Sequence, residues 1–214
     1  IITIAAAGNF YNQYNAMGVA YPAADPAVLS VGAVWSGDFG GPWTVATGAT
    51  DYTTGADRIA AISQRSTELL DIMAPGARFN GANATGGEQT MQGTSQAAGF
   101  VSGAAALSQQ LAQQVLGRKL STAEFATLLQ RTGDMILDGD DENDNVKNTG
   151  LSFPRIQFTR LFEEILTFTA LPDDGGAGGG AGGGAGGGTT RPQQAAAPGV
   201  HNVTVAAGES RTDV

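Results

Sequence analysis

The chain has 214 residues and is acidic, with 11 Lys and Arg against 20 Asp and Glu and a formal net charge of -9. This charge disfavours binding to nucleic acid or to an anionic membrane, since both require basic patches. The absence of cysteine excludes disulfides, thiolate catalysis and cysteine-ligated zinc, and no run approaches the roughly 18 apolar residues of a membrane span.

Three short apolar runs predict strands that are buried on both faces of a sheet. They cover residues 1–7, 28–34 and 69–74. The first run ends at Gly8-Asn9, and the third is closed by Pro75-Gly76. Because the first run starts directly at residue 1, it indicates a strand that belongs to a larger sheet.

Helical patterns follow the strands along the chain. Residues 95–116 begin with many small side chains, which predicts a helix packed closely inside the domain. Residues 122–131 predict a second helix, because Ser121-Thr122-Ala123-Glu124 matches a capping box. Residues 153–168 are amphipathic and predict a third helix, whereas residues 36–61 are rich in Gly and Thr and predict surface hairpins or loops.

The alternation of apolar strands with helices predicts an α/β layered sheet, whose sites lie at the carboxyl ends of the strands. We expect this domain to occupy residues 1–170. Residues 171–199 contain Gly and Ala repeats followed by Pro, Gln and Ala, which predicts a flexible linker. Residues 200–214 show an approximate alternation of Val and predict the start of a truncated β module.

Two residues carry the candidate chemistry: Ser95 at the start of the small-residue helix and Asn9 at the end of the first strand. A serine at a helix N-terminus can be an acyl-transfer nucleophile if a base is present, because nearby N–H groups favour negative charge. Its simpler interpretation is a helix cap. An asparagine at a strand end can donate its amide to an oxyanion, and its simpler interpretation is a turn residue.

Together with their neighbours these residues form an ordered series that strongly resembles the subtilisin-like serine proteases, the subtilases, over residues 1–165. The series is Ala5-Ala6-Ala7-Gly8-Asn9, Tyr21-Pro22-Ala23, Val28-Leu29-Ser30-Val31-Gly32-Ala33-Val34, Met73-Ala74-Pro75-Gly76, Gly93-Thr94-Ser95-Gln96-Ala97-Ala98 and Val101-Ser102-Gly103-Ala104-Ala105-Ala106-Leu107. The resemblance implies a three-layer α/β fold with a mostly parallel sheet, incomplete at its N-terminus. Gly99 departs from the family pattern, which usually has a proline there.

The resemblance also implies roles for single residues. Ser95 is the nucleophile, and the Asn9 side-chain amide joins the Ser95 backbone N–H in the oxyanion hole. The residues implied in substrate binding are Gly8, Phe10, Ala20, Gly93 and Thr94. The implied protein is a serine endopeptidase that acts on polypeptides through an acyl-enzyme, requires no cofactor, and is secreted or located at the cell surface.

The family's catalytic triad further implies an aspartate and a histidine that precede the serine, and this chain begins after both. The single histidine, His201, lies beyond the predicted linker and has none of the family's surrounding motif. We therefore expect the chain to need the upstream part of the catalytic domain. Alone it should be inactive, because a serine without its base is a weak nucleophile. The alternative function is a non-catalytic subtilase-like domain that serves extracellular adhesion or assembly.

An acidic run at residues 138–145 has two interpretations. Clustered carboxylates suit a structural calcium ion, with Asp138, Asp140, Glu142 and Asp144 as candidate ligands. The run lacks the glycine at the sixth position of an EF-hand loop, so a solvated acidic turn is the simpler interpretation. If calcium binds, a calcium-stabilised binding module becomes a third functional interpretation.

Overall fold

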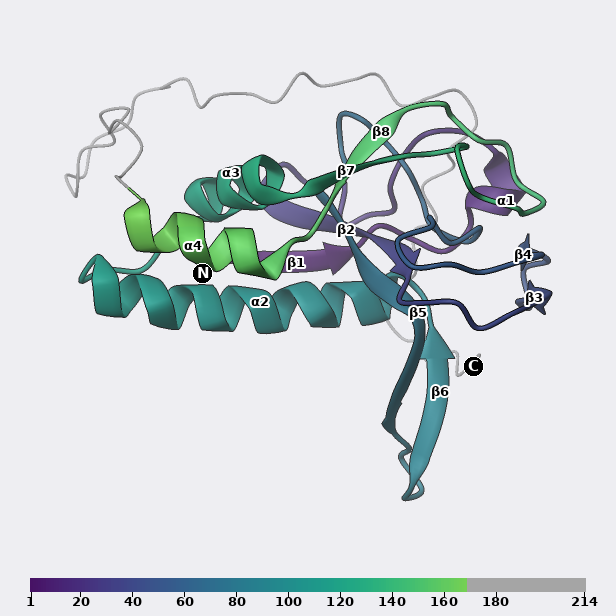
Figure 1. Ribbon diagram of the computed structural model, residues 1–214, viewed down its shortest axis with the longest axis horizontal. Coiled ribbons are helices and arrows are strands. Elements are labelled where there is room, and N and C mark those ends of the chain that lie inside the picture. The colour runs from purple at the N-terminus through teal and green to yellow at the C-terminus, as the bar shows by residue number, and fades with distance from the viewer. Residues whose placement is uncertain (169–214) are drawn as a thin grey trace.

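One six-stranded sheet forms the centre of the computed structural model, which describes residues 1–168 (Figure 1). The strands that run parallel are β1 (Thr3–Ala6), β2 (Val28–Trp35), β5 (Ile72–Ala82) and β8 (Ser152–Arg155), in that order. The strands that pair antiparallel are β6 (Glu88–Gln92) with β5, β7 (Asp134–Leu137) with β8, and β3 (Trp43–Thr44) with β4 (Thr50–Asp51) in a small separate sheet. The predicted α/β fold with a mostly parallel sheet is confirmed.

Strand β1 forms one edge of this sheet. Within residues 1–168 it pairs with β2 on one side and with no strand on the other. The linker and the β module predicted for residues 171–199 and 200–214 lie outside the described residues.

The helices within residues 1–168 are α1 (Tyr11–Tyr14), α2 (Thr94–Val115), α3 (Thr122–Thr132) and α4 (Phe158–Thr167). Helix α2 is 22 residues long, carries no charged side chain, and packs on β1, β2 and β5. Helix α3 begins with the predicted capping box, in which Ser121 and Glu124 bond to each other's backbone N–H. In this part of the chain no helix combines the length and hydropathy needed to cross a membrane.

Alternating side chains of the strands build two hydrophobic clusters, one on each face of the sheet. On one face, strand residues such as Val31 and Ile72 pack with α2, α3 and α4, where Leu128 is fully buried. On the other face, Val34 and Met73 pack with loop residues from the segments 19–24 and 59–70. The sheet therefore lies between a layer of helices and a layer of loops.

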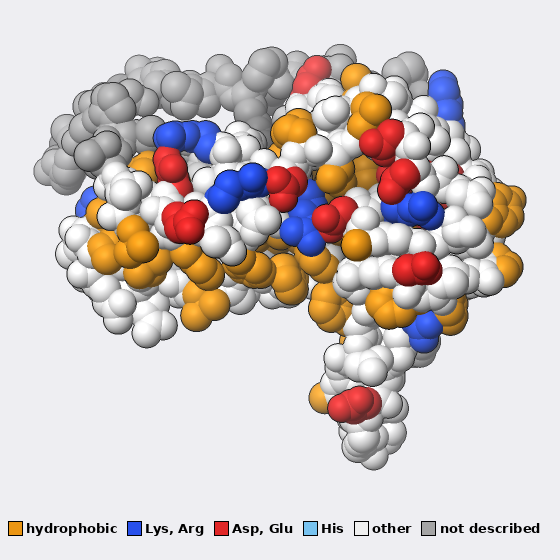
Figure 2. All heavy atoms as spheres, in the orientation of Figure 1, with side chains coloured by type: hydrophobic (Ala, Val, Ile, Leu, Met, Phe, Trp, Pro, Cys, Tyr) orange, Lys and Arg blue, Asp and Glu red, His pale blue; other side chains and the backbone are white. Residues whose placement is uncertain are grey.

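The structure corrects the bounds of two predicted elements. The third strand does not end at Pro75-Gly76 but runs on to Ala82, and its pairing with β2 shifts register at this point, where an irregular ladder tolerates a proline. Its continuation forms, with β6, a hairpin that projects from the body (Figures 1 and 2). Residues 153–168 are not one helix, because residues 152–155 form β8 and the helix begins only at Phe158.

Gly76 marks the point at which β5 meets the start of α2. A Cβ atom on Gly76 would lie 2.7 Å from the carbonyl oxygen of Gly93, 2.8 Å from the Cβ of Ala33 and 2.9 Å from the Cβ of Ala97. The Gly93 N–H also donates to the Gly76 carbonyl at 2.8 Å. Only glycine therefore lets the strand and the helix start come this close.

We expect Gly76→Ala to lower the free energy of unfolding by about 1–3 kcal/mol, because the atoms that it would meet belong to the backbone or are Cβ atoms that cannot rotate away. Gly99→Ala is the matched control, since a Cβ there meets nothing within 4 Å. Inside a helix this change should raise stability by about 0.5–1 kcal/mol. Urea unfolding measures both variants, and an unchanged midpoint for Gly76→Ala would contradict the close approach.

Candidate active site

Ser95 lies in the first turn of α2, where β5 and β6 meet the helix (Figure 1). The helix begins at Thr94, and its N-cap, Gly93, makes no side-chain capping bond. Ser95 is exposed, and within residues 1–168 its hydroxyl has no hydrogen-bond partner. Its backbone N–H belongs to the first turn, whose amides have no acceptor inside the helix. Ser95 therefore does not cap the helix, and its hydroxyl is accessible from solvent.

Asn9 follows β1 and is held at the same helix start by Thr94. The Oδ1 of Asn9 accepts hydrogen bonds from the Thr94 backbone N–H at 2.8 Å and from the Thr94 hydroxyl at 3.0 Å. The Thr94 hydroxyl also accepts a bond from the Gly8 N–H at 3.1 Å. Thr94 is fully buried, which limits the access of water to these part-buried bonds. Because Oδ1 is occupied, Nδ2 is the end of the Asn9 amide that remains to donate.

Gly93 brings the Asn9 amide next to the helix start. A Cβ atom on Gly93 would lie 3.0 Å from the Nδ2 of Asn9 and 3.3 Å from its Oδ1, and the φ of Gly93 is +151°. Both the space and the backbone conformation therefore require glycine. The Asn9 amide therefore lies at the start of α2, beside Gly93, which is two residues before the backbone N–H and hydroxyl of Ser95.

Gly8 and Ala20 pack together next to Asn9. A Cβ on Gly8 would lie 3.1 Å from the Cβ of Ala20 and 3.1 Å from the Cγ of Gln64. The backbone holds this contact, since the Ala20 N–H donates to Ala7 and the Gln64 N–H donates to Gly8. Of the remaining residues predicted to bind substrate, Phe10 is 46% exposed, whereas Thr94 is buried beneath Asn9 and supports it.

A buried ion pair that the sequence did not predict supports the segment after Asn9. Arg65 and Asp138 have side chains with no exposed surface, and Nη1 of Arg65 lies 2.8 Å from Oδ1 of Asp138. The guanidinium of Arg65 also lies over the ring of Tyr11, 4.3 Å from its centroid. Tyr11 donates its hydroxyl to the Lys147 carbonyl at 2.8 Å. This pair therefore ties the residues after Asn9 to the loops around residues 62–66 and 138–149.

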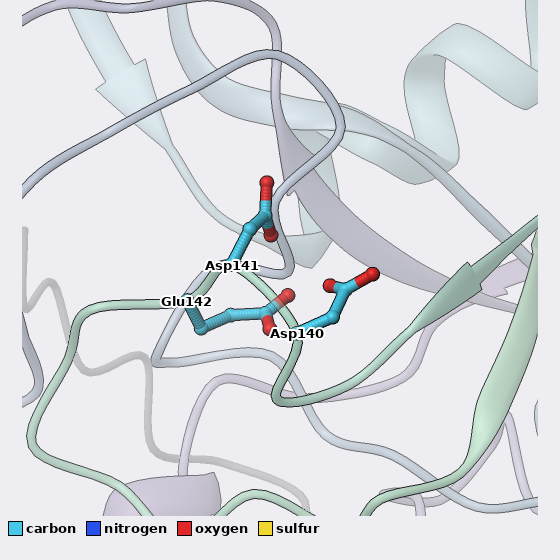
Figure 3. Close-up of side chains that lie close together, drawn as sticks. All are labelled: Asp140, Asp141 and Glu142. Carbon is cyan, nitrogen blue, oxygen red and sulfur yellow. The ribbon is translucent and has the colours of Figure 1, made fainter.

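The predicted calcium ligands lie in the acidic turn between β7 and β8 but do not form one cluster there. Asp138 is committed to Arg65 and accepts two further bonds from Thr149. Asp140, Asp141 and Glu142 instead have carboxylate oxygens within 4.8 Å of one another (Figure 3). Protein donors already reach two of these carboxylates, since Glu142 accepts from the Gly139 and Ile59 N–H groups and Asp141 pairs with Arg58. A structural calcium ion remains a prediction at this turn.

Asp51 on β4 is a buried carboxyl group beside the acidic turn. It is 6% exposed and accepts a hydrogen bond from the Ala61 N–H at 3.1 Å. Burial raises its pKa to about 6. Asp144 forms a β-bridge with Asp51, and burial raises the pKa of Asp144 as well. The contact between β4 and the acidic turn therefore brings two partly desolvated carboxyl groups together.

The chain resembles known proteins in sequence and in structure. A sequence model of the subtilase family matches residues 1–155. The structure of the prenylagaramide maturation protease PagA is 25% identical, with a TM-score of 0.55 over 79% of this chain and 52% of PagA. The self-cleaved protease domain of PatA is 26% identical, with a TM-score of 0.51 over 77% of this chain and 50% of that domain. The chain thus spans about half the length of these structures, and no curated protein matches it.

We expect Thr94→Val to destabilise the fold by about 1–3 kcal/mol, because it keeps the shape but leaves the Gly8 N–H without its acceptor. Thr94→Ser keeps the hydroxyl and is the matched control, with a smaller loss. Thermal unfolding monitored by circular dichroism measures the difference. Equal losses for the two variants would show that the hydroxyl does not hold the Asn9 segment.

Asp51 should make stability depend on pH. Its pKa in the folded state, about 6, lies above the ordinary value of 3.8, so the cost of ionising Asp51 grows between about pH 4 and pH 6 and is complete above pH 6. Asp51→Asn does not titrate. Lowering the pH from 6.5 to 4 should therefore raise the unfolding free energy of the wild type, relative to the variant, by about 2–3 kcal/mol. Urea unfolding of both proteins at the two pH values tests this, and a constant difference would refute it.

Proposed function

The chain belongs to the subtilase family, and from this premise we propose that it is the serine-bearing part of an endopeptidase domain. In this proposal Ser95 is the nucleophile, and the Asn9 amide and the Ser95 backbone N–H stabilise the oxyanion. The observation that carries the proposal is the fixed orientation of Asn9. The Thr94 N–H and hydroxyl both donate to its Oδ1, which leaves Nδ2 as the end of the amide that can donate to a substrate.

The proposed reaction forms and breaks bonds in two stages. The Ser95 Oγ attacks the carbonyl carbon of the peptide bond, and its proton passes to a base. The carbonyl oxygen becomes negative and receives hydrogen bonds from the Asn9 Nδ2 and the Ser95 N–H, donors that are already in place before the charge develops. The base returns the proton to the leaving amine, and water then attacks the acyl-enzyme to release the second product.

The base must come from outside the described part of the chain. Residues 1–168 contain no histidine, and His201 lies outside the described residues. We assign the base and its orienting aspartate to a part of the catalytic domain that precedes this sequence. The half-length match to PagA and PatA supports this assignment, as does the outer edge of β1, which pairs with no strand of residues 1–168. Without that part, the chain is expected to show no efficient turnover.

Substrates and setting follow from the same proposal. The substrates are polypeptides, and secretion or display at the cell surface rests on the family resemblance. PagA is described as a maturation protease, and this description applies to PagA itself. No cofactor enters the proposed reaction, since the serine, the base and the oxyanion donors complete it.

Labelling with a fluorophosphonate, in protein that carries the complete catalytic domain, tests the nucleophile. Wild-type protein should be labelled and Ser95→Ala should not. Equal labelling of the two would remove Ser95 from the reaction and favour the non-catalytic interpretation.

Asn9→Ala in the same complete protein should lower kcat by about 10²–10³-fold with little change in KM, because the lost bond is made to the oxyanion and not to the bound peptide. A loss of this size is known for removal of the oxyanion-hole asparagine in a protease of this family. Asn12→Ala is the matched control, since Asn12 lies three residues further on and bonds to Thr47. Equal effects of the two substitutions on kcat would exclude Asn9 from the oxyanion hole.

A further inference from the structure

Arg78 differs from the other arginines of residues 1–168 in having no carboxylate partner. The arginines that form ion pairs with Asp or Glu in this part of the chain are Arg58, Arg65, Arg118, Arg131, Arg155 and Arg160. A chain with 20 acidic residues against 11 basic ones offers carboxylates in excess. A partly buried guanidinium that remains unpaired in such a chain is therefore available to an anion from outside.

Aromatic side chains fix the position of Arg78. Its guanidinium carbon lies 3.9 Å from the ring centroid of Trp43 and 5.7 Å from that of Phe39. The Nε1 of Trp43 donates to the Phe39 carbonyl at 3.2 Å, which joins the two aromatic residues. Stacking of this kind orders the planar guanidinium while leaving its N–H groups at the edge free to donate. The side chain is thus oriented before any anion binds.

Arg78 borders a hollow at the base of the hairpin of β5 and β6, the hairpin that projects from the body in Figure 1. The hollow has a volume of about 370 Å³, and its lining residues are Phe39, Arg78, Phe79, Asn80 and Thr90. Thr90 donates its hydroxyl to the Asn80 side chain across the hairpin at 2.7 Å. Arg78 is the one charged residue of this lining. A small anionic group can therefore enter the hollow without meeting a competing carboxylate.

The hairpin connects this hollow to Ser95. Ala77 pairs with Gln92 across the hairpin, so Arg78 lies one residue beyond the pair and Ser95 lies three residues after it. Chain geometry then limits the Cα distance between Arg78 and Ser95 to about 20 Å. A peptide in extended conformation covers that distance with about six residues. One bound peptide can reach both places.

We propose that Arg78 and its aromatic support form a subsite for a carboxylate of the peptide substrate. The carboxylate belongs either to an acidic side chain or to a peptide C-terminus, and it accepts two parallel N–H bonds from the guanidinium. This inference rests on the proposed function for the identity of the ligand as a peptide. The binding itself requires neither Ser95 nor a base, so it can be measured on the present chain.

The test follows the Trp43 indole N–H by nuclear magnetic resonance during titration of the 214-residue chain at low ionic strength. The probes are three acetylated hexapeptides of alanine and glycine. One is amidated and contains a glutamate, one is amidated and contains a glutamine instead, and one lacks acidic side chains but has a free C-terminal carboxylate. At least one carboxylate peptide should bind about tenfold more tightly than the glutamine peptide, and the better one identifies the source of the carboxylate.

Two charge-matched variants separate the subsite from general electrostatics. Arg78→Gln should abolish the preference for a carboxylate, whereas Lys119→Gln removes the same charge next to a different groove and should retain it. Equal affinity of the wild type for all three peptides, or equal losses in the two variants, would overturn the proposal. Ser95→Ala should bind as the wild type does, so a failed labelling experiment and a failed titration are distinct results.

Discussion

The two hydrogen bonds from Thr94 to the Oδ1 of Asn9 are the contact on which the site depends. They connect the end of β1 to the start of α2, two elements separated by 85 residues in sequence. Parallel strands β1, β2 and β5 make this contact feasible, because their carboxyl ends meet at one edge of the sheet. Gly76 and Gly93 then allow the backbone to come close enough. In the proposed reaction, an amide that is oriented before substrate arrives needs no reorganisation when negative charge develops.

A buried ion pair gives the segment around Asn9 additional, electrostatic support. Arg65 and Asp138 are both fully buried, so each charge depends on the other for compensation. The stacking of Arg65 on Tyr11 extends this constraint to the segment that follows Asn9. One internal charge pair thus joins the loop that contains Arg65 to the turn that follows β7. The same pair removes Asp138 from the acidic turn and leaves that turn with exposed carboxylates.

The local parts of the fold were predictable, and the long-range parts were not. The strand at residues 28–34 and the capping box at Ser121 were correct because each is encoded in neighbouring residues. Strand β8 was missed because it is only four residues long and lies just before α4. Its residues were therefore read as part of the amphipathic pattern of that helix. The burial of Arg65 was not foreseeable, since the polar run around it is typical of a surface loop, and only the position of Asp138 explains it. Family resemblance predicted roles for Asn9 and Ser95, but the bonds that orient Asn9 required the structure.

Strand β1 pairs with no second strand among residues 1–168, and this open edge has a consequence for how the chain behaves in solution. An edge strand presents unpaired N–H and C=O groups, which can template pairing with a strand from another molecule. The neighbouring helix α2 adds no charged side chain that would oppose such contacts. Long-range repulsion then comes from the net charge of -9, and salt screens it over about 10 Å at 0.1 M. Added salt is therefore expected to weaken the repulsion that keeps separate copies of this chain apart.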